Sequence, residues 1–300
     1  MDALPVLFYE SVLPYFQINS IEASKRLTGV VGQVASEIFE NGFIHRIAVT
    51  NGQLKEDLRK LAYRDAKDFD VEGIRSKYNK QTRVVVRARS SAYRTDPEMI
   101  KKLPTATRGK NIHLWIYTCH ISKELELWIA SLSSLHTLLI NARITDLIRR
   151  IVRRVVEKKM LGGISFKINE PLEPPTVQLL VDLFKQDQFV AAHLSNDALK
   201  VIKQLINSWT SNSTQMAGKF VWCENVSASI LRSTKFGFVD CGEEERRYVA
   251  TLYPVAQGKG PKRWPTRQPF RACVLRSPIG HVIYWLFPEN EAAQSLVLFV

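Results

Sequence analysis

The sequence has 300 residues, of which 45% are hydrophobic, 24% charged and 10% aromatic. This composition is enough for a substantial packed core, and it excludes collagen-like, low-complexity and disulfide-dense proteins. The formal net charge of +13 favours contact with phosphate-rich polymers, anionic surfaces or acidic proteins, although the same charge also serves solubility.

Residues 4–40 are predicted to form two or three short helices. Apolar residues recur at helical spacing from Leu7 to Phe16, and a second series runs from Ile21 to Ile38 after a polar break. The N-terminus has an acidic second residue and no basic region, so a signal peptide is not expected. Because no apolar run approaches the roughly 20 residues that span a bilayer, we expect an intracellular protein, cytoplasmic or nuclear, with no membrane span.

Residues 43–110 are predicted to connect these helices to a larger domain. An extended run at 45–54 contains Asn51-Gly52, a pair that favours a tight hairpin turn. The run at 82–90 is rich in β-branched residues and is predicted to be a strand with its arginines on one side, which usually faces solvent. Between these two runs the sequence is charged and only weakly periodic.

A repeating pattern begins near residue 111. Five short apolar runs are separated by gaps of 25, 27, 25 and 31 residues and begin at Ile112, Thr137, Ile164, Phe189 and Phe220. A strand and a helix repeating at this interval indicate stacked βα units, since one unit alone cannot bury its apolar face. The fold class expected is therefore α/β, with leucine-rich-repeat-like units forming a curved sheet, mixed or parallel. The leucine-rich-repeat consensus itself is absent.

The end of the chain is predicted to be an antiparallel strand cap. Strand-like runs occur at 246–255, 270–277 and 281–289, and a basic, proline-rich loop separates the first two. The expected organisation is thus a helical segment at 1–42, a strand-containing connection at 43–110 and a repeat domain with its cap at 111–300.

Motifs for catalysis or metal binding are absent from the sequence. No HExxH, GxSxG, phosphate-binding glycine loop or calcium loop occurs, and the six histidines are dispersed. The spacing of the four cysteines fits neither a zinc site nor a disulfide framework, so we predict reduced thiols at Cys119, Cys223, Cys241 and Cys273. We predict a protein that is not an enzyme and uses no cofactor or metal.

Two basic clusters are candidate anion-binding sites. On the predicted helix at 145–159, apolar residues occupy one half and four arginines occupy the other, namely Arg149, Arg150, Arg153 and Arg154. Such a ridge is usually a solvated face, but guanidinium groups also bind phosphate, lipid headgroups or acidic partners. The second cluster combines charge with an aromatic ring that could stack on a base or simply anchor its loop: Lys262, Arg263, Trp264 and Arg267.

The N-terminal segment resembles a degenerate F-box, the helical module that attaches substrate receptors to the adaptor of cullin-type ubiquitin ligases. Leu4-Pro5 is similar to the opening pair of that module, and four residues stand where it carries apolar contact or packing residues: Val12, Phe16, Ile21 and Leu27. The usual Cys and Trp near the third helix are missing. More broadly, the chain resembles an uncharacterised protein family expanded in roundworms, in which F-box-like N-termini precede repeat-like regions.

This resemblance implies a non-enzymatic receptor that joins a ligase adaptor through residues 1–42 and selects a protein target with residues 110–300. Alternatively, the same N-terminal helices only cap the repeat array. A docking module must leave Leu4, Pro5 and Phe8 accessible, whereas a capping helix buries them. A function of another class is also open, namely binding of nucleic acid or an anionic surface through the two basic clusters.

Overall fold

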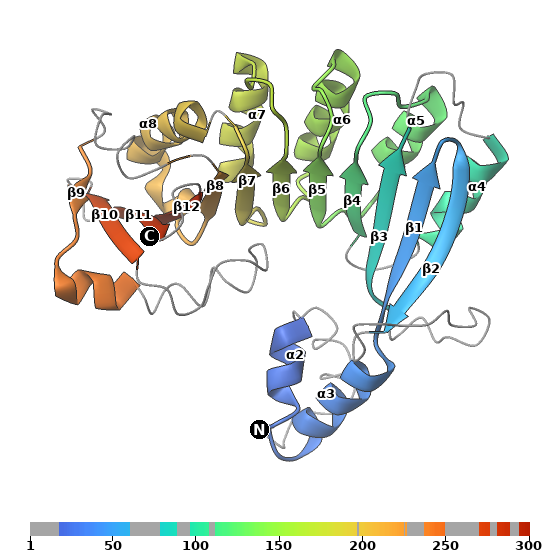
Figure 1. Cartoon of the computed structure of the whole chain (residues 1–300), viewed down its shortest axis with the longest axis horizontal. Coiled ribbons are helices and arrows are strands. Elements are labelled where there is room, and N and C mark those ends of the chain that lie inside the picture. The colour runs from blue at the N-terminus through green and yellow to red at the C-terminus, as the bar shows by residue number, and fades with distance from the viewer. Residues whose placement is uncertain are drawn as a thin grey trace. The chain divides into compact units, whose positions relative to one another are not determined.

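The computed structural model describes residues 18–60, 79–88, 97–107, 112–196, 198–224, 226, 237–249, 270–276, 281–288 and 294–300. The chain divides into two compact units, Met1–Thr137 and Leu138–Val300. The described strands form a mixed sheet of twelve in the order β2-β1-β3-β4-β5-β6-β7-β8-β12-β11-β10-β9. The predicted α/β class, with βα repetition and an antiparallel C-terminal part, is confirmed (Figure 1).

The described part of the first unit starts at Ile18 with a helical hairpin and continues into strands. Its described elements are α2 (Ile18–Ser24), α3 (Val30–Asn41), β1 (Phe43–Thr50), β2 (Gln53–Lys60), β3 (Asn79–Arg87), α4 (Pro97–Ala106), β4 (Ile112–Ile116) and α5 (Lys123–Ser131). The predicted boundary at residue 42 lies between α3 and β1.

The connection between the two helices packs closely on α3 because a glycine stands at the contact. A Cβ atom on Gly32 would lie 1.8 Å from the carbonyl oxygen of Leu27. Gly29 precedes α3 with a φ of 77°, a conformation that glycine adopts without steric cost. The apolar faces of the two helices then bury a small core made by Ile21, Val31, Val34, Ala35 and Ile38.

Strands β1 and β2 form the predicted Asn-Gly hairpin. They pair antiparallel, and the turn residues Asn51 and Gly52 have φ values of 50° and 79°. Positive φ at both turn residues matches the right-handed twist of the strands. On its other edge β1 pairs parallel with β3, which pairs parallel with β4.

The second unit contains most of the βα series and the C-terminal strands. Its described elements are β5 (Thr137–Ile140, whose first residue belongs to the first unit), α6 (Asp146–Glu157), β6 (Gly163–Phe166), α7 (Pro174–Phe184), β7 (Ala191–Leu194), α8 (Ala198–Met216), β8 (Phe220–Glu224), β9 (Val239–Asp240), β10 (Phe270–Arg276), β11 (Val282–Pro288) and β12 (Gln294–Phe299). All five predicted strands of the series are present within two residues of their expected starts.

Every helix of the series falls on one face of the sheet. Parallel neighbours joined by a helix make right-handed crossovers, which carry successive helices to the same side, and Figure 1 shows α6 and α7 on the same side of their strands. Alternate residues such as Leu138, Ile140 and Leu194 are fully buried beneath these helices. The remaining alternate residues of β3, β4, β6, β7 and β8 point away from these helices, and we call their surface the open strand face. At β8 this surface is covered, because Phe220 and Trp222 pack in one buried cluster with Cys241 and Val249.

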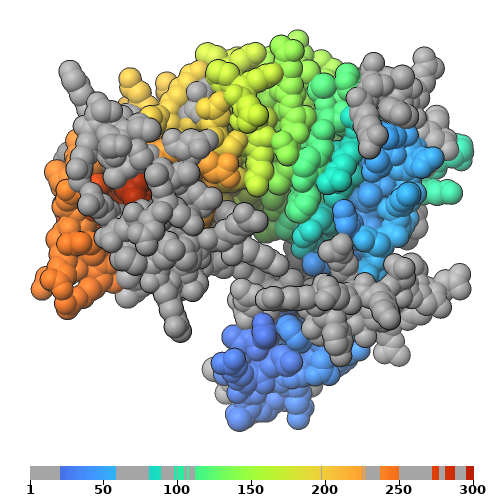
Figure 2. Space-filling view, in the orientation of Figure 1, coloured from blue at the N-terminus to red at the C-terminus, as the bar shows by residue number. Residues whose placement is uncertain are grey.

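Neighbouring helices are joined by polar contacts at their ends. Figure 2 shows α6 and α7 side by side, and Arg149 of α6 pairs with Glu173 at the start of α7. At the other end of α7, the buried Lys219 ammonium donates hydrogen bonds of 2.8 Å to the carbonyl oxygens of Phe184 and Gln186. This lysine caps the Phe184 carbonyl at the end of α7, and the Gln186 carbonyl also accepts a hydrogen bond from the backbone N–H of Phe189.

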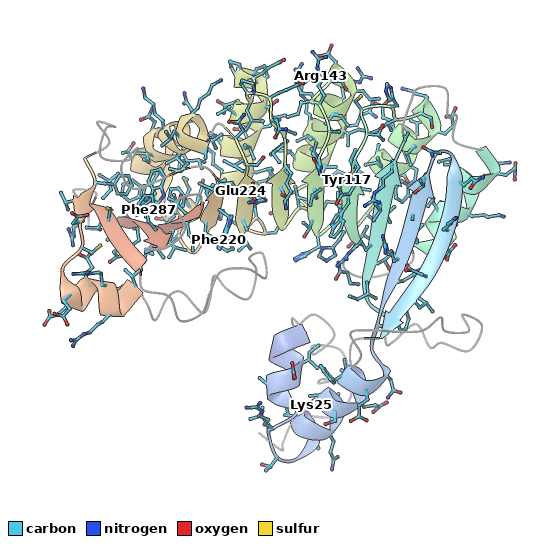
Figure 3. The ribbon with its side chains drawn as sticks, in the orientation of Figure 1. Lys25, Tyr117, Arg143, Phe220, Glu224 and Phe287 are labelled. Atoms are coloured by element: carbon cyan, nitrogen blue, oxygen red, sulfur yellow. The ribbon has the colours of Figure 1, made fainter. Side chains whose placement is uncertain are left out.

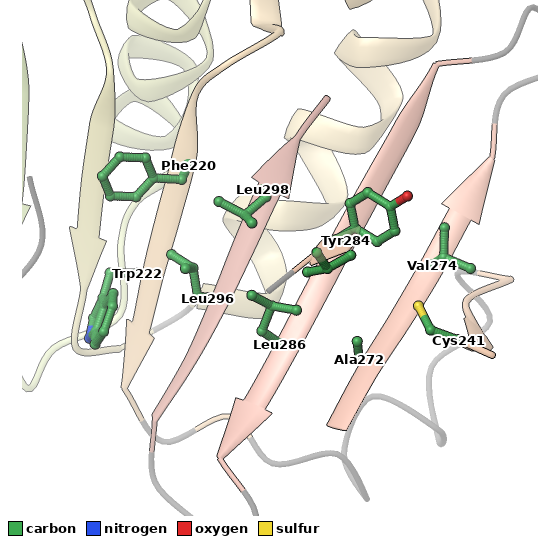
Figure 4. Close-up of a cluster of buried hydrophobic side chains, with 10 residues drawn as sticks. Phe220, Trp222, Cys241, Ala272, Val274, Tyr284, Leu286, Leu296 and Leu298 are labelled. Carbon is green, nitrogen blue, oxygen red and sulfur yellow. The ribbon is translucent and has the colours of Figure 1, made fainter. Parts of the chain in front are cut away.

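The C-terminal strands extend the sheet antiparallel from β8. β12 pairs with β8, followed by β11, β10 and β9. Their side chains form the apolar cluster of Figure 4, which includes Phe220, Trp222, Leu286 and Leu298.

One predicted strand of the cap is wrong in its described part. The chain from 243 to 249 is helical, with an ion pair of 2.6 Å between Glu243 and Arg247 one turn apart. The strand β12, which the sequence interpretation did not include, pairs directly with β8.

Candidate functional site

The open strand face of the first unit carries two stacked pairs of arginine and aromatic side chains. The guanidinium carbon of Arg83 lies 4.3 Å from the ring centroid of Trp115, and that of Arg87 lies 4.6 Å from the ring centroid of Tyr117. Arg83 and Arg87 belong to β3, and Trp115 lies on β4. Tyr117, which Figure 3 labels, directly follows β4. We call these four residues the arginine–aromatic rows.

Strand register places the four side chains on one surface. Arg83 stands opposite His113 and Val85 opposite Trp115 in the parallel ladder, so the Arg83 guanidinium reaches two residues ahead along β4. Val86 stands opposite Ile116, so Arg87 and Tyr117 follow directly opposite each other. The residues between them, including Val84, Val86 and Leu114, are at most 2% exposed and form the core on the helix side. Ring stacking is a favourable contact for a guanidinium and holds its plane in a fixed orientation.

Among the described residues around the rows, the charge is mainly positive. On the neighbouring strands Arg46 pairs with Asp57 at 3.8 Å, and the exposed Lys55 lies on the same side of the sheet. The imidazole of His113 lies beside that of His136, with ring centroids 5.4 Å apart. Burial, together with the nearby His136 and Arg83, lowers the pKa of His113 to about 3, so this imidazole is neutral at pH 7.

A second polar group lies on the open strand face of the second unit. The Ser165 hydroxyl is 2.8 Å from His193 Nδ1, and His193 Nε2 is 2.9 Å from a carboxylate oxygen of Glu224. These residues come from β6, β7 and β8, and Ser165 and His193 are direct register partners. Burial lowers the pKa of His193, while Glu224 opposes the shift. A neutral His193 ring accepts a hydrogen bond from the Ser165 hydroxyl and donates one to the Glu224 carboxylate, so each of the three side chains has a hydrogen-bond partner.

This group contains the residue types of a serine hydrolase triad, but its geometry does not favour that chemistry. Ser165 is only 8% exposed, and it lies within a strand whose two sides carry parallel neighbours. Backbone N–H groups in such a ladder are already paired and cannot stabilise a developing oxyanion. We therefore interpret the group as a hydrogen-bonded bridge that orders three strands.

The predicted adaptor-contact residues are only partly within the described structure. Leu4, Pro5, Phe8, Val12 and Phe16 lie outside the described residues. Ile21 is fully buried in the hairpin core, so it holds the helices together. Leu27 is 50% exposed and lines a shallow groove of about 550 Å³ together with Lys25, Gly29, Gly32, Gln33, Ser36, Glu37, Glu40 and Asn41.

The predicted arginine ridge on α6 is not uniform. Arg149 is 17% exposed and pairs with Asp146 at 2.6 Å and with Glu173, so it belongs to the contact between α6 and α7. Arg150 and Arg153 are exposed, and Arg154 is half-buried. The predicted loop cluster of Lys262, Arg263, Trp264 and Arg267 lies outside the described residues.

The sequence interpretation missed the arginine–aromatic rows, although it placed their strands correctly. The alternation in Ile112–Ile116 put His113 and Trp115 on the side opposite the core, and the same rule put Arg83 and Arg87 on one side of β3. Within the described part of the chain, no group of His, Cys, Asp and Glu residues is arranged to hold a metal ion. The helices of that part include none that is long and apolar enough to cross a membrane.

Comparison with protein-family models, curated proteins and solved structures gives no match to this chain. Interpretation of its function therefore depends on the residues of the open strand face and of the helical hairpin.

Proposed function

We propose that this chain is a non-catalytic, protein-binding receptor that holds its target on the open strand face of the first unit. The observation that carries the proposal is the pair of arginine–aromatic rows, in which Arg83 and Arg87 stack on Trp115 and Tyr117. Arginine, tryptophan and tyrosine dominate the energetics of protein interfaces because they combine large contact area with directed hydrogen bonds. Repeat arrays commonly use one extended surface in this way.

The second part of the proposal is attachment to a ubiquitin-ligase adaptor through the helical hairpin. It is supported by the F-box resemblance of the N-terminal segment and by the exposure of Leu27 beside the groove. An exposed leucine next to a groove offers an apolar contact that the folded hairpin does not itself use. The receptor would then present the target and the adaptor on two separate surfaces.

A quantitative pull-down with the full-length chain tests both attachments at once. Leu27→Asp is expected to lose the ligase adaptor and keep the targets, whereas Arg87→Gln is expected to lose targets and keep the adaptor. The matched controls are Leu127→Asp, at another leucine that is 53% exposed, and Arg153→Gln, at an exposed arginine of α6. Both controls should retain the adaptor and the targets. Equal adaptor retention by wild type and Leu27→Asp would contradict the ligase assignment.

Binding of nucleic acid or another phosphate-bearing surface is the second candidate. It is favoured by the exposed Arg150 and Arg153 of α6 and by the net charge of +13. Phosphate contacts weaken by orders of magnitude as salt rises, whereas an interface built on packed aromatic residues changes much less. A titration of binding against salt therefore separates the two candidates.

A further inference from the structure

We infer that two copies of this protein associate through β2, whose outer edge pairs antiparallel with the same edge of the second copy. This inference goes beyond the proposed receptor function, because it concerns another surface and does not depend on the ligand of the open strand face. It follows from the place of β2 in the sheet, the direction of its backbone groups and the side chains that meet in the pairing.

Strand β2 ends the described sheet on the side of the first unit. Proteins usually protect such an edge by keeping it short, by interrupting it with proline or a bulge, or by lining it with charges such as lysine. β2 has eight residues, longer than the roughly five or six that are usual, and it contains no proline. Its register with β1 runs without a shift, and its charges are of both signs, with Lys55 beside Glu56 and Asp57. The edge is therefore a surface on which another strand can pair.

The hydrogen bonds of β1 show which backbone groups of β2 point outward. Directly after β1, the N–H of Asn51 donates to the carbonyl oxygen of Arg87 on β3 at 2.9 Å. Because successive residues of a strand direct these groups to alternate sides, the odd-numbered residues of β1 face β3 and the even-numbered ones face β2. Thr50 is opposite Gln53, so the odd-numbered residues of β2 bond to β1. The outward N–H and C=O groups, which no backbone hydrogen bond joins to another described residue, belong to Leu54, Glu56 and Leu58.

A second copy supplies a strand that matches this edge. With a two-fold axis at Glu56, each Leu54 stands opposite Leu58 of the second copy, and the three outward residues of both strands exchange their hydrogen bonds. Closed two-fold association is also the commonest form of soluble oligomer. The described sheet ends on its other side at β9, which has only two residues and is too short to pair with β2 in place of the second β2.

The side chains that meet in this register favour the association. Residues directly opposite in an antiparallel pair lie on the same side of the sheet. The half-buried Leu54 therefore packs beside Leu58 of the second copy, and the exposed Lys55 approaches Asp57 of the second copy. The Asp57 side chain is 40% exposed although Arg46 of its own chain lies 3.8 Å away, so it can accept a second positive charge nearby. Symmetry makes each of these contacts occur twice.

Glu56 stands opposite its own counterpart, where two carboxylates repel each other. Its carboxylate oxygen lies 2.9 Å from His45 Nε2 on β1, so the charge leans away from the outer edge. The remaining repulsion weakens the association, and its removal should strengthen it.

Sedimentation equilibrium of the full-length protein over a range of concentrations measures the association. We expect the average mass to rise with concentration from 34.3 kDa toward twice that value. Glu56→Gln removes the repulsion but retains the outward N–H, so it should lower the dissociation constant of the dimer several-fold. Glu56→Pro removes the same charge and the outward N–H but no bond to β1, so it should raise that constant about tenfold or more.

A disulfide between the copies tests the register without a proline. Across the two-fold axis the Cα atoms at position 56 are about 5.5 Å apart, a distance that a disulfide spans. Glu56→Cys should therefore form a covalent dimer in glutathione disulfide. Lys55→Cys should not, because its counterpart lies diagonally at about 7 to 8 Å. The wild type gives the background from the native cysteines.

Three results would overturn the inference. The first is a monomer at every concentration, and the second is equal association of Glu56→Gln and Glu56→Pro with unchanged melting temperatures. The third is equal trapping of Glu56→Cys and Lys55→Cys, which would place the contact elsewhere and which decides the question if the proline variant does not fold. The pull-down depends on Leu27 and Arg87 and not on these variants, so it reports separately on the receptor proposal.

Discussion

Acidification from pH 7 to pH 5.5 is expected to destabilise the strands around His113. Burial beside His136 and Arg83 lowers the pKa of His113 from 6.5 to about 3 in the folded chain. Between these two values the unfolded chain binds a proton that the folded chain does not bind. The stability contribution of the neutral imidazole is thus complete above pH 6.5 and is lost progressively as the pH falls toward 3.

The size of the effect follows from proton linkage. With an unfolded pKa of 6.5 and a folded pKa near 3, the free energy of unfolding should fall by about 1.3 kcal/mol between pH 7 and pH 5.5. The result depends little on the folded pKa as long as it stays well below 5, because the folded imidazole is then neutral at both pH values. A change of about 1.3 kcal/mol corresponds to roughly an eightfold change in the opening equilibrium.

Hydrogen exchange of peptides that cover β4 measures this opening locally, which suits a chain of two compact units. After correction for the intrinsic exchange rate, protection in the wild type should fall about eightfold more than in His113→Gln. His120→Gln, at an exposed histidine seven residues away in the same unit, should keep the wild-type pH dependence. The same pH dependence in the wild type and in His113→Gln would refute the argument.

Three substitutions test the packing contacts described above. Gly32→Ala should destabilise the helical hairpin by about 2 kcal/mol or more in thermal melting, because its Cβ would lie 1.8 Å from a carbonyl oxygen. Gly242→Ala is the control and should be nearly neutral, because its Cβ meets no atom within 4 Å. Lys219→Met removes two hydrogen bonds made by a residue that is 5% exposed, so it should lower the free energy of unfolding in urea by about 1 to 3 kcal/mol. An unchanged free energy would show that water replaces the ammonium group. Arg149→Ala should lower the free energy of unfolding in urea by about 1 kcal/mol, because two ion pairs and the packing of the side chain are lost. Arg153→Ala, at an exposed position of the same helix, should change it by no more than about 0.5 kcal/mol. Equal effects of the two substitutions would contradict the role assigned to Arg149.

The βα series could be predicted from sequence because its signals are local. Each strand contains alternating or continuous apolar residues, and α6 begins where the Thr145 side chain accepts a hydrogen bond from the backbone of Ile148. Its buried residues, from Ile148 to Val156, repeat at helical spacing. These features lie within about a dozen residues of one another, so they are visible without knowledge of the rest of the fold.

The contacts that make the candidate site are not local. Sequence alternation shows that Arg83 and Trp115 both lie opposite the core, but the parallel register of β3 and β4 is needed to bring one over the other. The same limit applies to Arg149, which a helical wheel places on the polar side of α6. Its partner Glu173 lies 24 residues away, at the start of the next helix.

The pairing of β8 with β12 illustrates the same limit at the scale of the fold. Phe220 of β8 pairs with Leu298 of β12, at the far end of the chain, and both belong to the cluster of Figure 4. Each strand alone reads only as a short apolar run. Their order in the sheet depends on which long-range pairing buries the most apolar surface.

The topology explains why recognition is expected on the open strand face. The right-handed crossovers carry the helices of the series to one face, so the backbone of β3 and β4 is held by ladders and by a core on that side. Along β3, Val86 contributes to that core and the next residue, Arg87, contributes to the open strand face. Side chains such as Arg87 and Tyr117 can therefore vary with the ligand while the scaffold is maintained by their neighbours. This separation allows a single βα framework to carry a binding surface whose chemistry is set by alternate residues of adjacent strands.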